Sequence, residues 1–184
     1  HWSIARYDND AWSLAEPMPA ASRYDAAGLL EGTHNEFYAV AAVNRSLCRF
    51  DAEHLECFAG ELQVAPSAGA VHGTAYYYAE GTMLYHVTDI RTDAPAFVET
   101  GFALPFAVGD LVVVDEAAHG ETIIGDGRGS ASYLIGLSDS MQILAVLLEN
   151  GAPASYVAMP GTGATAGAFR AGWAFYDEET AATR

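Results

Sequence analysis

Residues 37–58 read FYAVAAVNRSLCRFDAEHLECF, and this stretch decides the fold class. Its aromatic and aliphatic residues form short runs, and turn-favouring polar residues separate them. This is the pattern of short β-strands joined by hairpins. Residues 51–54 make a four-residue hairpin loop between two such runs. The stretch therefore predicts strands near 46–50 and 55–59 that pair with each other.

The predicted hairpin also specifies which residues face one another. Its register pairs Phe50 with Leu55, and it places Arg49 opposite Glu56 as an ion pair of opposite charges. The same register places Cys48 opposite Cys57, at a separation that a disulfide can bridge after a modest adjustment. We predict that bond, and the alternative is two buried free thiols. Two cysteines without paired histidine spacing cannot complete a zinc site.

One glycosylation sequon, Asn44-Arg45-Ser46, precedes the same hairpin. Such tripeptides are common, so the sequon carries weight only beside the cysteine pair. Disulfides persist in oxidising compartments. Together the two features predict a secreted chain, extracellular or at the cell surface, with Asn44 as a glycosylation site.

The pattern of short strands continues along the chain from residue 36. We therefore divide the chain into an N-terminal segment, 1–35, and a β-repeat domain, 36–184. The segment reads as irregular, although short strands are also possible there. Beyond it, strands are expected near 36–42, 46–50, 55–59, 73–79, 82–88, 95–99, 110–115, 121–124, 131–137, 141–148, 154–159 and 171–176.

Aromatic strands recur at a spacing close to 40 residues. Tyr38 and Tyr77 are 39 positions apart, and so are Leu134 and Trp173. Tyr77 and Leu134 are 57 positions apart, and an extra hairpin near 109–124 would account for the difference. Units of about 40 residues with about four short strands are typical of β-propeller blades.

Two phrases of the sequence, FYAV…LCRF at 37–50 and AFRAGWAFY at 168–176, resemble secreted surface proteins with propeller repeats. The resemblance covers about residues 36–176. It implies an all-β fold: a β-propeller, or a partial propeller of about four to five blades. The length is short for a closed ring of blades of this size. The alternative architecture is an antiparallel β-sandwich.

The charge of the chain excludes several partners. Eight basic residues, all arginine, stand against 24 acidic ones, for a formal net charge of −16. Nucleic-acid phosphates and anionic membrane surfaces attract basic patches, so neither is an expected partner. No apolar run approaches the 18 or so residues of a membrane helix, so membrane insertion is not expected. An acidic surface suits a secreted protein in salt, where ions screen its self-repulsion.

Groups that could carry chemistry do not form a convincing set. The acidic stretch Asp110, Asp115, Glu116, Glu121 and Asp126 is reminiscent of paired glycosidase carboxylates. Asp110 and Asp115, however, flank one predicted strand and would lie near its opposite ends. The oxygen donors at 8–10 and at Asp126 do not match a calcium loop. We therefore expect no metal, no cofactor and no catalytic residues.

Three consecutive tyrosines, Tyr76, Tyr77 and Tyr78, must alternate between the two faces of one strand. At least one of them should point away from the core. With Tyr85, the exposed rings of Tyr76 and Tyr78 could form a stacking surface for a sugar or a protein. The alternative is that these aromatic rings fill the space between blades.

These features predict a non-catalytic structural or binding module of a larger secreted or cell-surface assembly. A protein partner or self-association is expected, because blades that do not close a ring leave sheet faces to be covered. The alternatives are a secreted carbohydrate-active enzyme, either a glycoside hydrolase or a lyase, and a carbohydrate-binding lectin on the same scaffold.

Overall fold

A computed structural model describes residues 3–8, 11–17, 24–29, 37–41, 44–50, 55–115, 131–138, 142–159, 164–166, 175–177 and 182–183. All regular elements in this part of the chain are strands. They are β1 (Ser3–Asp8), β2 (Ala11–Pro17), β3 (Tyr24–Leu29), β4 (Phe37–Ala41), β5 (Ser46–Phe50), β6 (Leu55–Glu61), β7 (Ala68–His72), β8 (Ala75–Glu80), β9 (Met83–Thr88), β10 (Ala96–Ala103), β11 (Asp110–Asp115), β12 (Ser132–Leu137), β13 (Ile143–Glu149), β14 (Ala152–Met159), β15 (Ala164–Ala166), β16 (Phe175–Asp177) and β17 (Ala182–Thr183). Within the described ranges, no helix has the length and apolarity needed to cross a membrane.

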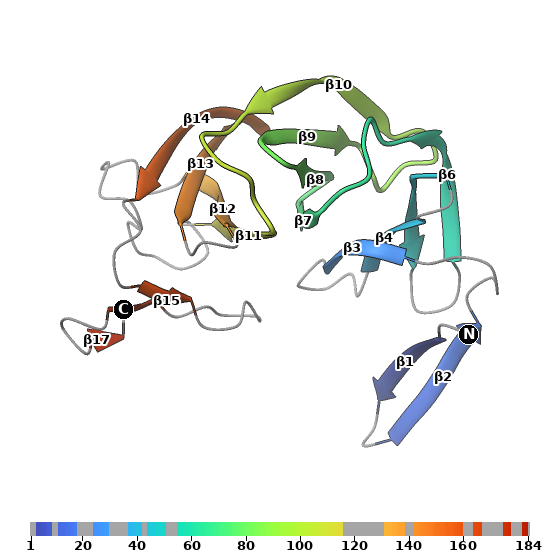
Figure 1. Ribbon diagram of the computed structural model, residues 1–184. Helices are drawn as coiled ribbons and strands as arrows, with labels where there is room; N and C mark the ends of the chain where they lie inside the picture. The colour runs from blue at the N-terminus through green and yellow to red at the C-terminus, as the bar shows by residue number, and fades with distance from the viewer. Residues whose placement is uncertain are drawn as a thin grey trace. The chain divides into compact units, whose positions relative to one another are not determined.

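Most strands belong to three four-stranded sheets (Figure 1). Each sheet takes four strands that follow one another in the chain: β3 to β6, β7 to β10 and β11 to β14. Neighbours in sequence are also neighbours in the sheet, so each sheet is a meander. A two-stranded sheet, β1–β2, and a three-stranded sheet, β15–β17, complete the set.

Successive four-stranded meanders are the sheet arrangement of propeller blades. The fold class is all-β, and the open sheets fit a partial propeller. A β-sandwich would instead distribute the strands over two sheets. The predicted repeat has a structural counterpart as well, since Tyr38, Tyr77 and Leu134 all lie on the second strand of their sheet, β4, β8 and β12. The long interval before Leu134 contains 116–130, where the predicted strand 121–124 lies, outside the described residues.

The first four-stranded sheet includes β3, which lies before the expected boundary between 1–35 and 36–184. Strand β3 pairs with β4 in antiparallel register, with Tyr24 opposite Ala41 and Leu29 opposite Phe37. Its sequence, YDAAGL, has few β-branched residues and its register shifts between Asp25 and Gly28. Pairing with β4 gives this stretch a strand conformation that its own residues favour weakly.

Strand β7 was missed for the same reason, since its sequence is AGAVH. The strand predicted at 73–79 instead begins at Ala75, after a two-residue hairpin turn in which His72 pairs with Ala75. Gly73 has a positive φ of 58° in this turn, which glycine adopts without steric cost. The remaining predicted strands that fall on described residues are present, with boundaries that differ by a few residues.

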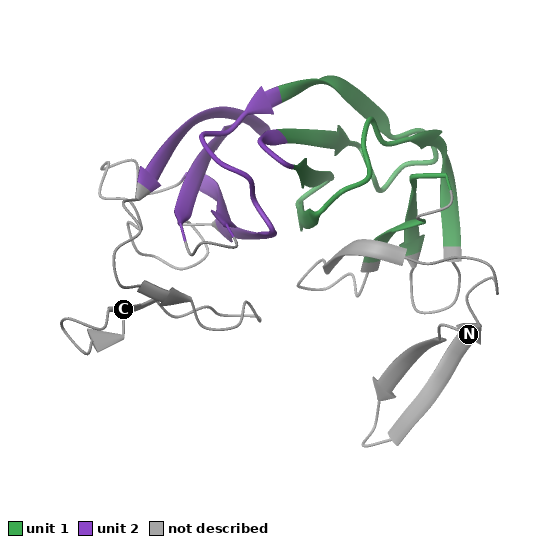
Figure 2. Cartoon of the chain, viewed as in Figure 1, with its two compact units in different colours: residues 1–80, 84–101 green, residues 81–83, 102–184 purple. Residues whose placement is uncertain are grey.

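The described chain divides into two compact units (Figure 2). Unit 1 contains the sheets β3–β6 and β7–β10, except for a few residues at 81–83 and from 102 onward. One apolar core joins these two sheets. Tyr38, Val40 and Leu47 reach it from the first sheet, and Tyr76 and Val87 reach it from the second. The shared core shows that the two sheets of unit 1 pack against each other.

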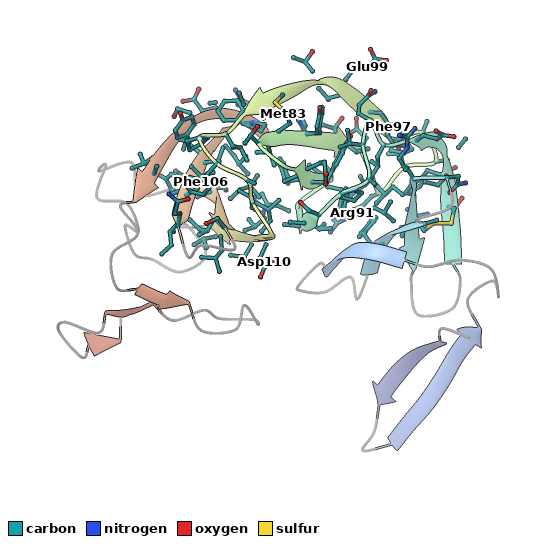
Figure 3. All side chains as sticks on the ribbon, viewed as in Figure 1. Met83, Arg91, Phe97, Glu99, Phe106 and Asp110 are labelled. Carbon is teal, nitrogen blue, oxygen red and sulfur yellow. A yellow bond between two sulfur atoms is a disulfide. The ribbon has the colours of Figure 1, made fainter. Side chains whose placement is uncertain are left out.

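Two hydrogen bonds and one close van der Waals contact join the two sheets of unit 1. The Tyr38 hydroxyl donates a hydrogen bond to the Ile90 carbonyl at 3.4 Å. The Gln63 backbone N–H donates to the Tyr78 hydroxyl at 3.2 Å. The ring of Phe97, labelled on β10 in Figure 3, lies directly against Gly60 of β6, where any Cβ would overlap the ring.

Unit 2 contains the sheet β11–β14, and its core is built from residues of β11, β12 and β13. Six consecutive residues of β13, from Ile143 to Leu148, are buried. A strand covered on both faces shows a continuous apolar run rather than alternation. The turn that follows has positive φ at Asn150 and Gly151, as the Asn-Gly pair predicts for a hairpin.

Candidate functional site

The β5–β6 hairpin has the register expected from the sequence. Cys48 stands opposite Cys57, Arg49 opposite Glu56 and Phe50 opposite Leu55. The two cysteines form a disulfide with an S–S distance of 2.02 Å. Cys48 is buried and Cys57 is exposed, so one end of the bond reaches solvent. The hairpin loop at 51–54 lies outside the described residues.

Arg49 connects this hairpin to the neighbouring sheet. One guanidinium nitrogen lies 2.8 Å from a Glu56 carboxylate oxygen, and another donates to the Arg91 carbonyl at 3.1 Å. The guanidinium carbon also lies 5.6 Å from the centre of the Phe58 ring, in a cation–π contact. Because Glu56 is half exposed, the ion pair adds little stability. Because its guanidinium group already contacts these three partners, Arg49 helps to pack the hairpin and is not a candidate for binding a ligand.

Asn44 lies exposed in the turn between β4 and β5. Its side-chain oxygen accepts a hydrogen bond from the Ser46 backbone N–H at 3.3 Å, and Arg45 has a positive φ of 55°. Arg45 in turn lies 3.2 Å from the Glu61 carboxylate. The turn therefore presents the Asn44 side chain to solvent, whereas Ser46 is buried. Glycosylation of Asn44 stays a prediction.

The tyrosines do not form the exposed surface that the sequence suggested. Tyr76 and Tyr77 have no exposed area, and Tyr78 is 1% exposed. Tyr85 is half buried and packs on the same core. The rings of Tyr76 and Tyr78 stack with centres 5.9 Å apart, and those of Tyr78 and Tyr85 with centres 5.3 Å apart. Tyr77 alternates with them and stacks on His86 on the other face of β8, and that face is covered as well. The expected exposed ring is therefore not found among these three tyrosines.

Burial also controls the ionisation of these tyrosines. It raises the pKa of Tyr77 to about 12 and raises the pKa of Tyr76 and Tyr78 as well. A hydroxyl held neutral in this way is no acid or base at neutral pH. The cluster therefore acts as packing material, which is the alternative that the sequence left open.

His86 provides a titratable group in this packing. Its ring stacks on Tyr77 with centres 5.9 Å apart, and burial lowers its pKa below the ordinary value of 6.5. The folded protein thus binds fewer protons than the unfolded chain below about pH 6.5, so this contribution to stability falls as the pH falls. We expect the unfolding midpoint to drop between pH 7.5 and 5.5.

The matched variant His86→Phe keeps an aromatic ring against Tyr77 and removes the titration. Its midpoint should fall less over the same pH range, as measured by thermal unfolding followed by circular dichroism. The carboxyl groups titrate alike in both proteins, so the difference between the two isolates His86. Equal losses in the two proteins would show that His86 contributes nothing to the acid sensitivity.

The predicted carboxylates lie apart where the structure describes them. Asp110 and Asp115 are the first and last residues of β11 (Figure 3 labels Asp110). At roughly 3.3 Å per residue they are separated by about 16 Å along the strand, which is wider than the roughly 5–10 Å of a glycosidase pair. Burial raises the pKa of Asp110, whose carboxylate accepts a hydrogen bond from the Leu111 backbone N–H. Glu116, Glu121 and Asp126 lie outside the described residues.

A metal site gains no support from the described side chains. Across those ranges, no three or more His, Cys, Asp or Glu groups are placed to hold an ion together. Of the oxygen donors at 8–10, the second and third lie outside the described residues.

The outermost strand of unit 2, β14, presents a surface that the sequence analysis did not single out. Tyr156 and Val157 are 43% and 51% exposed, and they are the large hydrophobic side chains that the described part leaves open to solvent. Neighbouring residues on a strand point to opposite faces, so both faces of β14 are partly open to solvent at this point. The Phe102 ring meets Tyr156 edge-on, with centres 6.2 Å apart. The sequence does contain a signal for this surface, because residues 150–169 carry no charged side chain although the chain as a whole is strongly acidic.

Comparisons with known proteins give likenesses only among solved structures. No protein-family model matches the chain, and no curated protein matches it. Among solved structures, a similar chain belongs to the crystal structure of BBS1N in complex with ARL6DN, soaked with lead. It shares 17% sequence identity with a TM-score of 0.44, over 79% of this chain and 44% of that one. This chain thus spans less than half the length of that neighbour, and no partner or activity is carried over.

Proposed function

We propose that this chain is a non-catalytic structural or binding module of an extracellular or cell-surface assembly, and that it contacts a protein through a sheet edge. The exposed, uncharged strand β14 carries this proposal. The outer edge of an end strand offers unpaired backbone N–H and C=O groups to another chain. Exposed apolar side chains on such an edge favour burial against a partner.

Two features of unit 1 support the extracellular part of the proposal. The disulfide between Cys48 and Cys57 favours an oxidising compartment, since the cytosol keeps most thiols reduced. The Asn44 side chain is exposed in a turn, which is where a glycan can be accommodated.

The net charge of −16 repels other acidic surfaces, so the uncharged edge of β14 is the contact that repels a partner least.

The residues that suggested a lectin or a carbohydrate-active enzyme are not placed to bind or cleave a sugar. Tyr76 and Tyr78 are buried, so they offer no ring to a sugar. Asp110 and Asp115 are too far apart along β11 to act on one glycosidic bond. No other described feature favours a lectin or a glycosidase.

The proposal is tested on the natural protein in the cells that make it. Intact cells are treated with trypsin, and the released peptides are identified by mass spectrometry. Amine-reactive surface labels suit this chain poorly because it contains no lysine side chain. The same sample, digested without reduction, should contain residues 46–49 linked to 50–91 through the disulfide, since trypsin cleaves after Arg45, Arg49 and Arg91.

Peptides released from intact cells, the linked pair and a glycan mass on the peptide 24–45 are the expected results. An intracellular protein used as a control should stay unreleased. Two free thiols together with an unmodified Asn44, in a protein that is released only on lysis, would overturn the extracellular assignment.

A further inference from the structure

The three four-stranded sheets of this chain end in three comparable strands, β6, β10 and β14. Each is the last strand of its meander, and each has only one hydrogen-bonded neighbour within its sheet. Because the three strands have equivalent positions, they can be compared directly. A property that only one of them has is not explained by its position in the sheet.

Charge distinguishes the three edges. Strand β6 carries Glu56 and Glu61, and β10 carries Glu99, which is exposed (Figure 3). Charged side chains on an edge strand discourage pairing with another chain. Strand β14 reads APASYVAM and carries no charge. This edge therefore lacks the protection that the other two have.

Burial distinguishes β14 in the same direction. Its residues 152 and 154–158 are exposed, including Tyr156 and Val157 on opposite faces. Its inner neighbour β13 is buried from Ile143 to Leu148 and pairs with it in antiparallel register, and among the described residues β14 has no strand on its other side. Pro153 suits an edge position, since proline cannot donate to a ladder. Within the described ranges, residues 154–159 have an outer edge that no strand of this chain occupies.

We propose that β14 pairs in antiparallel fashion with the β14 strand of a second copy of this chain, so that two unit 2 sheets become one continuous sheet across a two-fold axis. This inference rests on the proposed function and names the partner and the contact. A two-fold axis brings the same patch together from both copies, and antiparallel strands satisfy that symmetry.

Charge argues for a second copy as the occupant. Two chains of net charge −16 repel each other over most of their surfaces. Pairing through β14 places no charged side chain opposite another in any register, because the strand has none. A basic partner would instead find its complement on the acidic edges β6 and β10. Small residues such as Ala154, Ser155 and Ala158 also allow two sheet edges to approach closely.

A contact of six residues per copy is small, so the dimer should form in a concentration-dependent manner. It should also tighten with salt, since the Debye length falls from about 10 Å at 0.1 M to about 3 Å at 1 M. Sedimentation velocity of the full chain at both salt concentrations measures the association. Hydrogen exchange at high and low protein concentration should show extra protection confined to 154–159.

Substitutions at exposed positions separate pairing from folding. Val157→Glu should weaken dimerisation at least about tenfold, because the two-fold axis introduces two carboxylates into one apolar contact. Val157→Thr keeps a β-branched side chain without charge and should keep the dimer. Ala96→Glu adds the same charge to the exposed edge of β10 and should leave association unchanged.

A wild-type chain that stays monomeric at both salt concentrations would overturn self-pairing, and so would a dimer that Val157→Glu leaves intact. If 154–159 is protected only in the native assembly, by a different protein, self-pairing fails while the proposed binding function stands. If the copies pair but the natural protein is never released from intact cells, the pairing holds and the extracellular assignment fails.

Discussion

Tyr76→Ala is expected to lower the free energy of unfolding by about 3–5 kcal/mol, the range for removing a large aromatic side chain from a core. Tyr76 has no exposed surface, and its ring stacks on Tyr78 within the core that joins both sheets of unit 1. The loss combines removed apolar contacts with a cavity that the packed rings cannot fill. Urea unfolding followed by circular dichroism measures the change.

Two matched variants test the reason for that loss. Tyr76→Phe keeps the ring and removes only the hydroxyl, so a cost near 1 kcal/mol is expected. Tyr156→Ala removes the same side chain from the exposed strand β14 and should cost less than about 0.5 kcal/mol. If Tyr76→Ala does not fold, Tyr76→Leu gives a graded loss. A cost for Tyr76→Ala no larger than that for Tyr156→Ala would contradict the buried position of this ring.

Removing the disulfide is expected to have the next largest effect. The bond joins residues nine positions apart, and closing a loop of this size in the unfolded chain corresponds to about 2–3 kcal/mol. The double variant Cys48→Ala/Cys57→Ala should lose that amount in urea unfolding. A reducing agent should produce a similar loss in the wild type, because Cys57 is exposed.

The double variant provides the control for reduction. Its stability should not change when the reducing agent is added, which separates the disulfide from general effects of the reagent. A thiol assay under denaturing conditions should find none in the wild type. Two reactive thiols and a stability insensitive to reduction would show that the cysteines are free.

Local sequence was sufficient to predict the β5–β6 hairpin. Pairing of Cys48 with Cys57 and of Arg49 with Glu56 follows from the loop length alone, since alternation along two strands joined by a short loop leaves one register. The repeat of aromatic strands could also be recognised in the sequence. Tyr38, Tyr77 and Leu134 recur because the second strand of each sheet is an inner strand that needs apolar side chains.

Strands β3 and β7 could not be recognised from local sequence. Both are rich in alanine and glycine, which favour strands weakly, and both become strands because a neighbour supplies the ladder of hydrogen bonds. Strand β7 pairs with the tyrosine-rich strand β8. Small side chains beside large rings suit this position, because the tyrosines already occupy the volume of the core.

The amino-acid sequence by itself determined the all-β class, the hairpin register, the spacing of the aromatic strands and the net negative charge. These follow from periodicity, loop length and composition, which are local properties of the chain. The tertiary structure decided which faces of each strand are covered. It buried Tyr76, Tyr77 and Tyr78 together and left Tyr156 and Val157 of β14 exposed, because coverage depends on what packs against each face of a strand, and local sequence does not specify that.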